Sequence, residues 1–184
     1  YAAGLAFGNF AAVLSAYPAE KLHETIPHFH DTVSRYADFE AAVAKDPLKR
    51  AAGVAAEIDF VRARKNETGI LLDLMTRGEI PLRVTHNDTK LNNVLLDEET
   101  EAPVAVIDLD TVMPGSALYD FGDAIRFGSN PAAEDEQDLN KVYCELPFFE
   151  AYTRGYLAAC GESLTEKEIE LLPFSARLMT YECG

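Results

Sequence analysis

The sequence is short of basic residues, cysteines and long apolar runs, and it contains no tryptophan. Lys and Arg number 16 against 31 Asp and Glu, which gives a formal net charge of -15. A protein that binds nucleic acid needs a basic face, so this balance argues against a nucleic-acid partner. No apolar run approaches the roughly 18 residues of a membrane-spanning helix, so we expect no membrane segment.

The cysteines are few and widely spaced. Cys144, Cys160 and Cys183 form no C-x-x-C pair. Their odd number, together with the lack of a signal peptide, favours reduced thiols and a cytoplasmic location. The chain begins without Met inside a predicted helix and stops without a finished element. We therefore expect a piece of a longer protein, truncated at both ends.

Length and composition indicate one globular domain that covers residues 1–184. A chain of 184 residues is long enough to bury a core. The 48% hydrophobic and 26% charged residues are typical of a folded domain rather than a disordered chain. The sequence shows no internal repeat and no low-complexity stretch.

Helical periodicity dominates the chain on both sides of a central polar stretch. Small residues in the first predicted helix indicate close packing against another helix. Asp31 is a candidate N-cap, and T-E-K-E near Thr165 is a capping-box pattern. The predicted helices cover residues 2–16, 32–45, 47–65, 67–77, 119–127 and 148–159, and a last helix is capped by Ser163 or Thr165.

Short apolar runs in the middle of the chain predict a small β element. Residues 82–85 are a candidate buried strand, and residues 93–96 and 104–107 are predicted to pair as a hairpin. Pro114-Gly115 predicts a loop over 111–116, and residues 141–146 are predicted to be extended. The expected fold class is therefore mainly α with a small antiparallel β hairpin element (α+β).

A loop over residues 22–31 holds three of the four histidines, namely His23, His28 and His30. A metal site there is a minor alternative, because Pro27 interrupts the histidines and no helix places two of them at i and i+4. Polar contact with a substrate and a purely structural role both remain open.

Polar side chains cluster at the predicted hairpin, in the pattern H-x-D-x-K-x-x-N followed by an apolar strand that ends in Asp108. Transfer of a phosphoryl group to an alcohol needs a carboxylate near the acceptor hydroxyl, and Asp88 suits that role. Asn93 and Asp108 offer the hard oxygen ligands that Mg²⁺ prefers. Lys90 can reach the charge on the transferring group, and His86 is predicted to brace the loop.

These residues resemble the catalytic loop of protein-kinase-like phosphotransferases. H-N-D-T-K-L-N-N-V-L, V-I-D-L-D-T, the later D-F-G-D and the segment H-E-T-I-P-H-F-H-D are similar to the aminoglycoside phosphotransferase and choline kinase-like family. Within it the chain most resembles the sugar-kinase branch of the N-acetylhexosamine 1-kinase type. The resemblance covers nearly the whole chain and implies a C-terminal kinase lobe.

The resemblance also implies roles and partners. It implies ATP and Mg²⁺, with Asp88 as the catalytic base and Asn93 and Asp108 as metal ligands that form part of the cofactor-binding site. Lys90 would assist catalysis and bind the nucleotide. Asp120 would brace the catalytic loop, and a sugar would be the acceptor.

The sequence departs from protein kinases at three points. Asn87 stands where protein kinases carry Arg, which argues against control by activation-loop phosphorylation. Asp108-Leu109-Asp110 replaces D-F-G. No glycine-rich loop and no strand Lys paired with a helical Glu are visible, so we expect this chain to lack the N-terminal lobe and to have little or no activity alone.

Four alternatives compete with the sugar-kinase interpretation. V-A-V-I-D-L-D-T-V resembles the haloacid-dehalogenase motif, in which Asp108 would be the nucleophile and Asp110 the acid/base. Asp88 and Asn93 could make loop hydrogen bonds only. The chain could be a degraded kinase lobe that binds without catalysis. The acceptor could be choline or an aminoglycoside, although a choline site favours an aromatic cage. A P-loop kinase is excluded because no G-x-x-x-x-G-K-S/T occurs.

Overall fold

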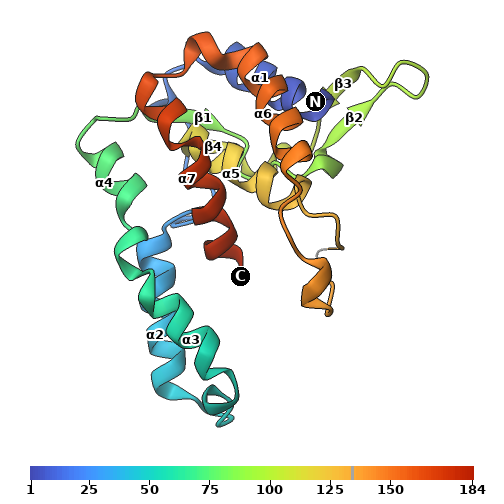
Figure 1. Cartoon of the computed structure of the whole chain (residues 1–184). Coiled ribbons are helices and arrows are strands. Elements are labelled where there is room, and N and C mark those ends of the chain that lie inside the picture. The colour runs from blue at the N-terminus through green and yellow to red at the C-terminus, as the bar shows by residue number, and fades with distance from the viewer. Residues whose placement is uncertain (134) are drawn as a thin grey trace.

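The computed structural model of the chain describes residues 1–133 and 135–184. Over these residues the protein is mainly helical with two small antiparallel sheets, which confirms the predicted fold class (Figure 1). The helices are α1 (Ala2–Leu14), α2 (Thr32–Lys45), α3 (Ala55–Ala63), α4 (Ile70–Thr76), α5 (Ala117–Gly128), α6 (Leu146–Cys160) and α7 (Glu166–Cys183). The strands are β1 (Arg83–Thr85), β2 (Val94–Leu96), β3 (Pro103–Val106) and β4 (Met113–Gly115).

The predicted hairpin is confirmed. Strands β2 and β3 pair in antiparallel register, with Val94 opposite Val106 and Leu95 opposite Ala105. A short polar turn connects them, in which Asp97 accepts hydrogen bonds from the backbone and hydroxyl of Thr100. The hairpin projects from the helical body (Figure 1).

The loop predicted over 111–116 is wrong, because β4 forms there and pairs with β1. Met113 is buried and its carbonyl accepts a hydrogen bond from the Thr85 hydroxyl at 3.0 Å. Pro114 is tolerated because a two-stranded sheet leaves its missing N–H on an edge. Gly115 is required by crowding, since a Cβ there would overlap the Thr85 hydroxyl. Pro114 and Gly115, which favour a turn in the sequence, therefore form part of a strand that packs closely against β1.

Helix α1 packs along α6, as its small residues predicted. A Cβ on Gly4 would overlap the carbonyl of Tyr152, and a Cβ on Gly155 would overlap the carbonyl of Tyr1. Glycine at both positions lets the two backbones approach. Figure 1 shows the two helices side by side at one end of the molecule.

Helix α5 is the centre of the core. Its residues from Ala117 to Ile125 are all buried, and it packs against α7. Phe121 is fully buried and meets Tyr152 edge-on at 5.8 Å between ring centroids. This burial fixes the helix that carries the D-F-G-D motif.

Helices α2 and α3 form an arm that extends away from the body (Figure 1). Asp31 caps α2 as predicted, since its carboxylate accepts from the Ser34 N–H at 2.9 Å. Arg62 on α3 donates to both oxygens of Glu40 on α2, at 3.0 and 2.8 Å.

Two expectations about the arm are wrong. The predicted helix over 47–65 begins only at Ala55, after a 3₁₀ turn at Ala51–Val54. Its apolar pattern also predicts that Val54, Ile58, Phe60 and Val61 are buried, but only Ile58 is buried and Phe60 is 54% exposed. The arm has few neighbours, so most of its apolar side chains remain uncovered.

Two further predictions concern the segments that lead into α6 and α7. The extended backbone predicted over 141–146 is present at Val142 and Glu145, between a 3₁₀ turn at Leu139–Lys141 and α6, which begins at Leu146. The capping box at the start of α7 is confirmed, with Thr165 and Glu168 exchanging side-chain-to-backbone hydrogen bonds.

Candidate functional site

The polar cluster lies where the β1–β4 sheet, the β2–β3 hairpin and α5 meet. The loop that follows β1 carries Asp88 and Lys90 and ends in a 3₁₀ turn, Leu91–Asn93, at the start of the hairpin. The Ile107 N–H donates to the Asn93 carbonyl at 2.9 Å, which extends the strand pairing by one residue. Asp108 directly follows Ile107, the residue that pairs with Asn93, so the hairpin places Asp108 close to Asn93.

Asn93 is joined directly to Asp88. Its buried amide nitrogen donates to the Asp88 carbonyl at 2.9 Å and to the Asp88 carboxylate at 3.1 Å. Because the amide nitrogen serves the loop, the amide oxygen is the atom that Asn93 can offer to a cation. The hydrogen bonds expected of a purely structural loop are therefore present. They involve the amide nitrogen of Asn93 and leave its amide oxygen for a metal ion.

His86 ties this loop to the turn that carries Asp108. Its ring is fully buried, and its Nε2 lies 2.9 Å from the Ile107 carbonyl. Its own carbonyl accepts from the Thr111 hydroxyl at 2.7 Å. Nδ1 accepts from the Asp88 N–H at 3.3 Å, so Nε2 is the protonated ring nitrogen. These bonds provide the predicted bracing.

Asp120 holds the same loop from α5. Its two carboxylate oxygens accept from the backbone N–H groups of His86 and Asn87, at 2.9 and 2.7 Å. Burial raises the pKa of this carboxyl to about 6, against the lowering effect of the two backbone hydrogen bonds. The bracing role that the family resemblance implies for Asp120 agrees with this geometry.

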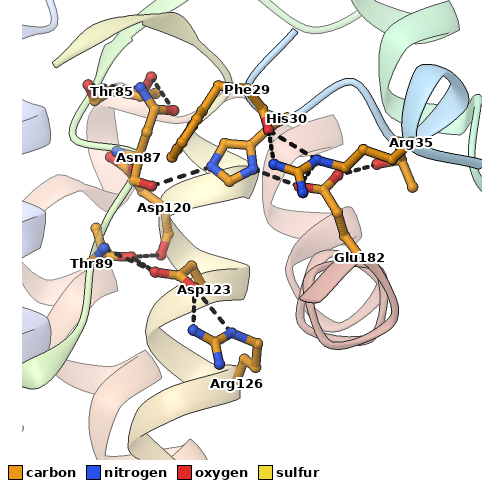
Figure 2. A network of polar contacts seen from close by, with 11 residues as sticks. Phe29, His30, Arg35, Thr85, Asn87, Thr89, Asp120, Asp123, Arg126 and Glu182 are labelled. Atoms are coloured by element: carbon orange, nitrogen blue, oxygen red, sulfur yellow. Dashed lines mark hydrogen bonds and ion pairs between the residues drawn. The ribbon is translucent and has the colours of Figure 1, made fainter. Parts of the chain in front are cut away.

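A second acid on α5 extends the support. Asp123 accepts from the Thr89 N–H at 3.0 Å and binds the Arg126 guanidinium at 3.0 Å (Figure 2). The Thr89 hydroxyl donates to the Asp120 carbonyl at 2.5 Å. The loop is therefore fixed to α5 on both sides of Asp88.

Two residues of the site have positive φ angles, Asn87 at 65° and Asp108 at 61°. Residues with a Cβ adopt this left-handed region at a cost, and Asn and Asp tolerate it best. Asp108 is exposed and follows the last residue pairing of the hairpin, so its carboxylate is available to a ligand.

Asp88 and Lys90 line a large open cavity. Its volume is about 1280 Å³, and its walls come from the arm, α5 and α7. The side chain of Asp88 is 29% exposed and that of Lys90 is 35% exposed, with Nζ 4.0 Å from the carboxylate. A small molecule in this cavity can reach both groups.

The structure thus brings Asp88, Lys90 and Asn93 together, and the hairpin adds Asp108. Among residues 1–133 and 135–184 no cluster of three or more His, Cys, Asp or Glu side chains has the arrangement of a metal site. His28 instead lies 2.9 Å from Asp31, and His30 lies 2.7 Å from Glu182. The sequence alone did not indicate Glu182 as the partner of His30, because the two residues are 152 positions apart and no local pattern links them.

The sequence matches the family model of the phosphotransferase enzyme family, APH, over residues 1–158. The chain belongs to this family. It is also 26% identical over 131 residues to the probable choline kinase 1 of Arabidopsis thaliana. The matched segment is 68% of this chain and 38% of that protein, so the chain spans well under half of the relative's length.

None of the helices formed by the described residues combines the length and the apolar character that crossing a membrane requires. The three cysteines are free thiols. Cys144 and Cys183 are exposed, whereas Cys160 is buried and its pKa is raised to about 11.

Proposed function

We propose that residues 1–184 are one domain, the C-terminal lobe of an ATP- and Mg²⁺-dependent kinase that phosphorylates a hydroxyl group of a small molecule, most suitably a sugar. In this proposal the complete protein also contains an N-terminal lobe, which covers the bound nucleotide. The free thiols and the acidic surface suit a cytoplasmic enzyme.

One observation carries this proposal: Asp88, Asn93 and the turn at Asp108 form a single hydrogen-bonded unit beside an open cavity. The Asn93 amide nitrogen bonds both the backbone and the carboxylate of Asp88, which leaves the Asn93 amide oxygen and the exposed Asp108 carboxylate for a ligand. A turn with a purely structural role does not require oxygen ligands placed next to a cavity.

The roles of the residues follow from the chemistry of phosphoryl transfer. Asp88 orients the acceptor hydroxyl and takes its proton as the new O–P bond forms and the bond from the γ-phosphorus to ADP breaks. Lys90 places a positive charge beside the transferring group. The Asn93 hydrogen bond to the Asp88 carboxylate keeps that carboxylate facing the cavity.

The donor set fits Mg²⁺ and nucleotide phosphates. Asn93 and Asp108 supply one amide oxygen and one carboxylate, and Mg²⁺ sites of this kind take their remaining ligands from phosphates and water. The bound cation would neutralise phosphate charge. Lys90 would contribute a further cation toward the nucleotide.

The charge of the cavity wall favours a neutral acceptor such as an N-acetylhexosamine over choline or an aminoglycoside. The wall contains four Asp or Glu, whereas its basic residues are Arg35, Arg64, Lys90, Arg126 and Arg177. Acids therefore do not outnumber bases here, although they do so strongly in the whole chain. The Arg64 guanidinium already covers the Phe60 ring at 3.4 Å, where a quaternary ammonium group would otherwise pack.

Measuring ATP turnover by the complete protein with a sugar, choline and an aminoglycoside as acceptors tests this proposal. We expect ATP turnover with Mg²⁺ to depend on a sugar, with choline and an aminoglycoside giving no more than the background rate. Turnover with choline alone would move the assignment to a choline kinase. Binding of Mg-ATP without turnover on any acceptor would favour the degraded, binding-only lobe.

The phosphatase alternative conflicts with the topology. Asp108 follows an antiparallel hairpin strand, whereas the dehalogenase motif opens a series of parallel strands and helices. That alternative also leaves the unit of His86, Asp88 and Asn93 without a role. Absence of a phospho-aspartate on Asp108 after reaction with a phosphate monoester is the result we expect.

A further inference from the structure

His30 lies in the loop between α1 and α2, where the other two histidines, His23 and His28, are exposed. Its side chain is 9% exposed. Its ring meets Phe29 edge-on at 4.7 Å between ring centroids (Figure 2). It also packs on the Tyr119 ring at 5.0 Å. The neighbouring His28 side chain is 71% exposed, so burial singles out His30 within this loop.

Both ring nitrogens of His30 face acceptors. Nδ1 lies 2.7 Å from a Glu182 carboxylate oxygen, and Nε2 lies 3.3 Å from the Asn87 carbonyl. A carboxylate and a carbonyl can only accept, so the ring makes both bonds when both nitrogens carry protons. The His30 ring therefore connects Glu182 on α7 to the catalytic loop.

Glu182 is well placed to hold the His30 ring. Its side chain is only 1% exposed, and it accepts from the Thr32 hydroxyl as well. Arg35 Nε lies 3.5 Å from the same carboxylate. A buried carboxylate requires such partners, so the His30–Glu182 pair fixes the ring in place.

The carbonyl that His30 holds belongs to the peptide group between Asn87 and Asp88. The N–H of the same peptide group donates to His86 Nδ1 at 3.3 Å. Two imidazole rings thus hold the two ends of one peptide group, one from each side of the loop. The plane of this group sets the backbone angle at Asp88 and with it the direction of the carboxylate.

We propose that His30 is a positioning residue for Asp88, anchored by Glu182, that sets the direction of the Asp88 carboxylate toward the acceptor. This inference rests on the proposed kinase function. His30 acts through the backbone and does not touch the reacting atoms. The two bonds to the peptide group are long, so losing one tilts the group and leaves the loop folded.

Steady-state kinetics of the complete protein test the inference, with His30→Gln compared with His23→Gln. His23 lies in the same loop and is exposed, which makes it a matched control. We expect His30→Gln to lower kcat by about 10- to 100-fold, with KM for both substrates within about twofold, because a misplaced base slows the step without weakening binding. His23→Gln should retain the wild-type kcat.

A rise in KM for the acceptor with unchanged kcat would overturn the inference, because it would place His30 in direct contact with the substrate. A double-mutant cycle adds a second check. If Glu182 acts through the ring, the double variant His30→Gln with Glu182→Gln should have about the same kcat as His30→Gln alone. Additive losses would contradict the anchoring role.

Amide hydrogen exchange separates this inference from the kinase assignment, since it needs no turnover. We expect the Asp88 amide to exchange on the order of tenfold faster in His30→Gln than in His23→Gln, while core amides of α5 are unchanged. Equal Asp88 exchange in the two variants would refute the inference even if the protein proves to be a kinase. A wild-type protein without kinase activity would refute only the proposed function.

Discussion

The Asn93 amide nitrogen lies 2.9 Å from the Asp88 carbonyl and 3.1 Å from the Asp88 carboxylate, so one side chain fixes both the backbone and the acid of its neighbour. The same residue receives the Ile107 N–H on its carbonyl. Asn93 therefore connects the acid to the hairpin that presents Asp108.

We predict that Asn93→Ala lowers the free energy of unfolding by about 1–3 kcal/mol, because it leaves buried groups of the loop without a donor. It should also lower phosphoryl transfer by at least about tenfold and raise the Mg²⁺ concentration needed for half-maximal rate. Denaturant unfolding and Mg²⁺ titration of turnover measure these effects. Asn92→Ala, at an exposed neighbouring position, is the control and should change neither.

The raised pKa of Asp120 leads us to predict that the free energy of unfolding depends on pH. Burial raises its pKa from 3.8 to about 6, so between these values the folded chain binds a proton that the unfolded chain has released. This contribution to stability is fully present below about pH 4 and declines as the pH rises to about 6. The stability of the wild type relative to Asp120→Asn should therefore fall over that interval.

Denaturant unfolding at several pH values checks the Asp120 prediction. Asp38→Asn, at an exposed position, provides the comparison and should show no such change relative to wild type. A wild-type advantage that grows between pH 4 and 6 would mean that the Asp120 pKa is lowered by its hydrogen bonds rather than raised by burial.

The pair formed by Arg83 and Glu168 predicts a large stability effect far from the cavity. Arg83 donates to both oxygens of the fully buried Glu168, at 2.6 and 2.8 Å, and this contact raises the Arg83 pKa. Glu168→Gln should lower the free energy of unfolding by about 3–5 kcal/mol, because it leaves a guanidinium without its counter-charge. Glu170→Gln, which affects an exposed pair with Lys167, should cost less than about 1 kcal/mol in the same thermal or denaturant unfolding.

Gly122 in the D-F-G-D motif predicts a packing effect. A Cβ there would overlap the Ser175 carbonyl and lie 2.6 Å from the Met179 side chain on α7. Gly122→Ala should therefore lower the melting temperature and cost about 1–3 kcal/mol. Gly53→Ala meets nothing within 4 Å and should be neutral or slightly stabilising. Equal melting temperatures for the two variants would contradict the packing account.

The sequence predicted those parts of the fold and site whose causes are local. The Asp31 cap, the Thr165–Glu168 capping box and the β2–β3 hairpin all depend on residues within a few positions or across one turn. Asp88, Asn93 and Asp108 lie on that hairpin or next to it, so their grouping was predictable as well. Their catalytic and ligand roles stay predictions.

The features that the sequence could not predict depend on contacts between distant segments. Strand β4 exists because β1, nearly thirty residues earlier, pairs with it, and Pro114-Gly115 alone indicates a turn. The His30 side chain is only 9% exposed and is bonded to Glu182 on the last helix, and no periodicity links the two. Phe60 is exposed because the arm lacks a third layer to cover it.

The most direct test of the central claim is the rate of phosphoryl transfer from ATP by the complete protein carrying Asp88→Asn, with Asp110→Asn as the matched control. We predict a loss of at least about a hundredfold for Asp88→Asn, since it removes the general base, with Mg-ATP binding retained. Asp110→Asn should retain most of the rate. Equal rates for wild type and Asp88→Asn would contradict the account.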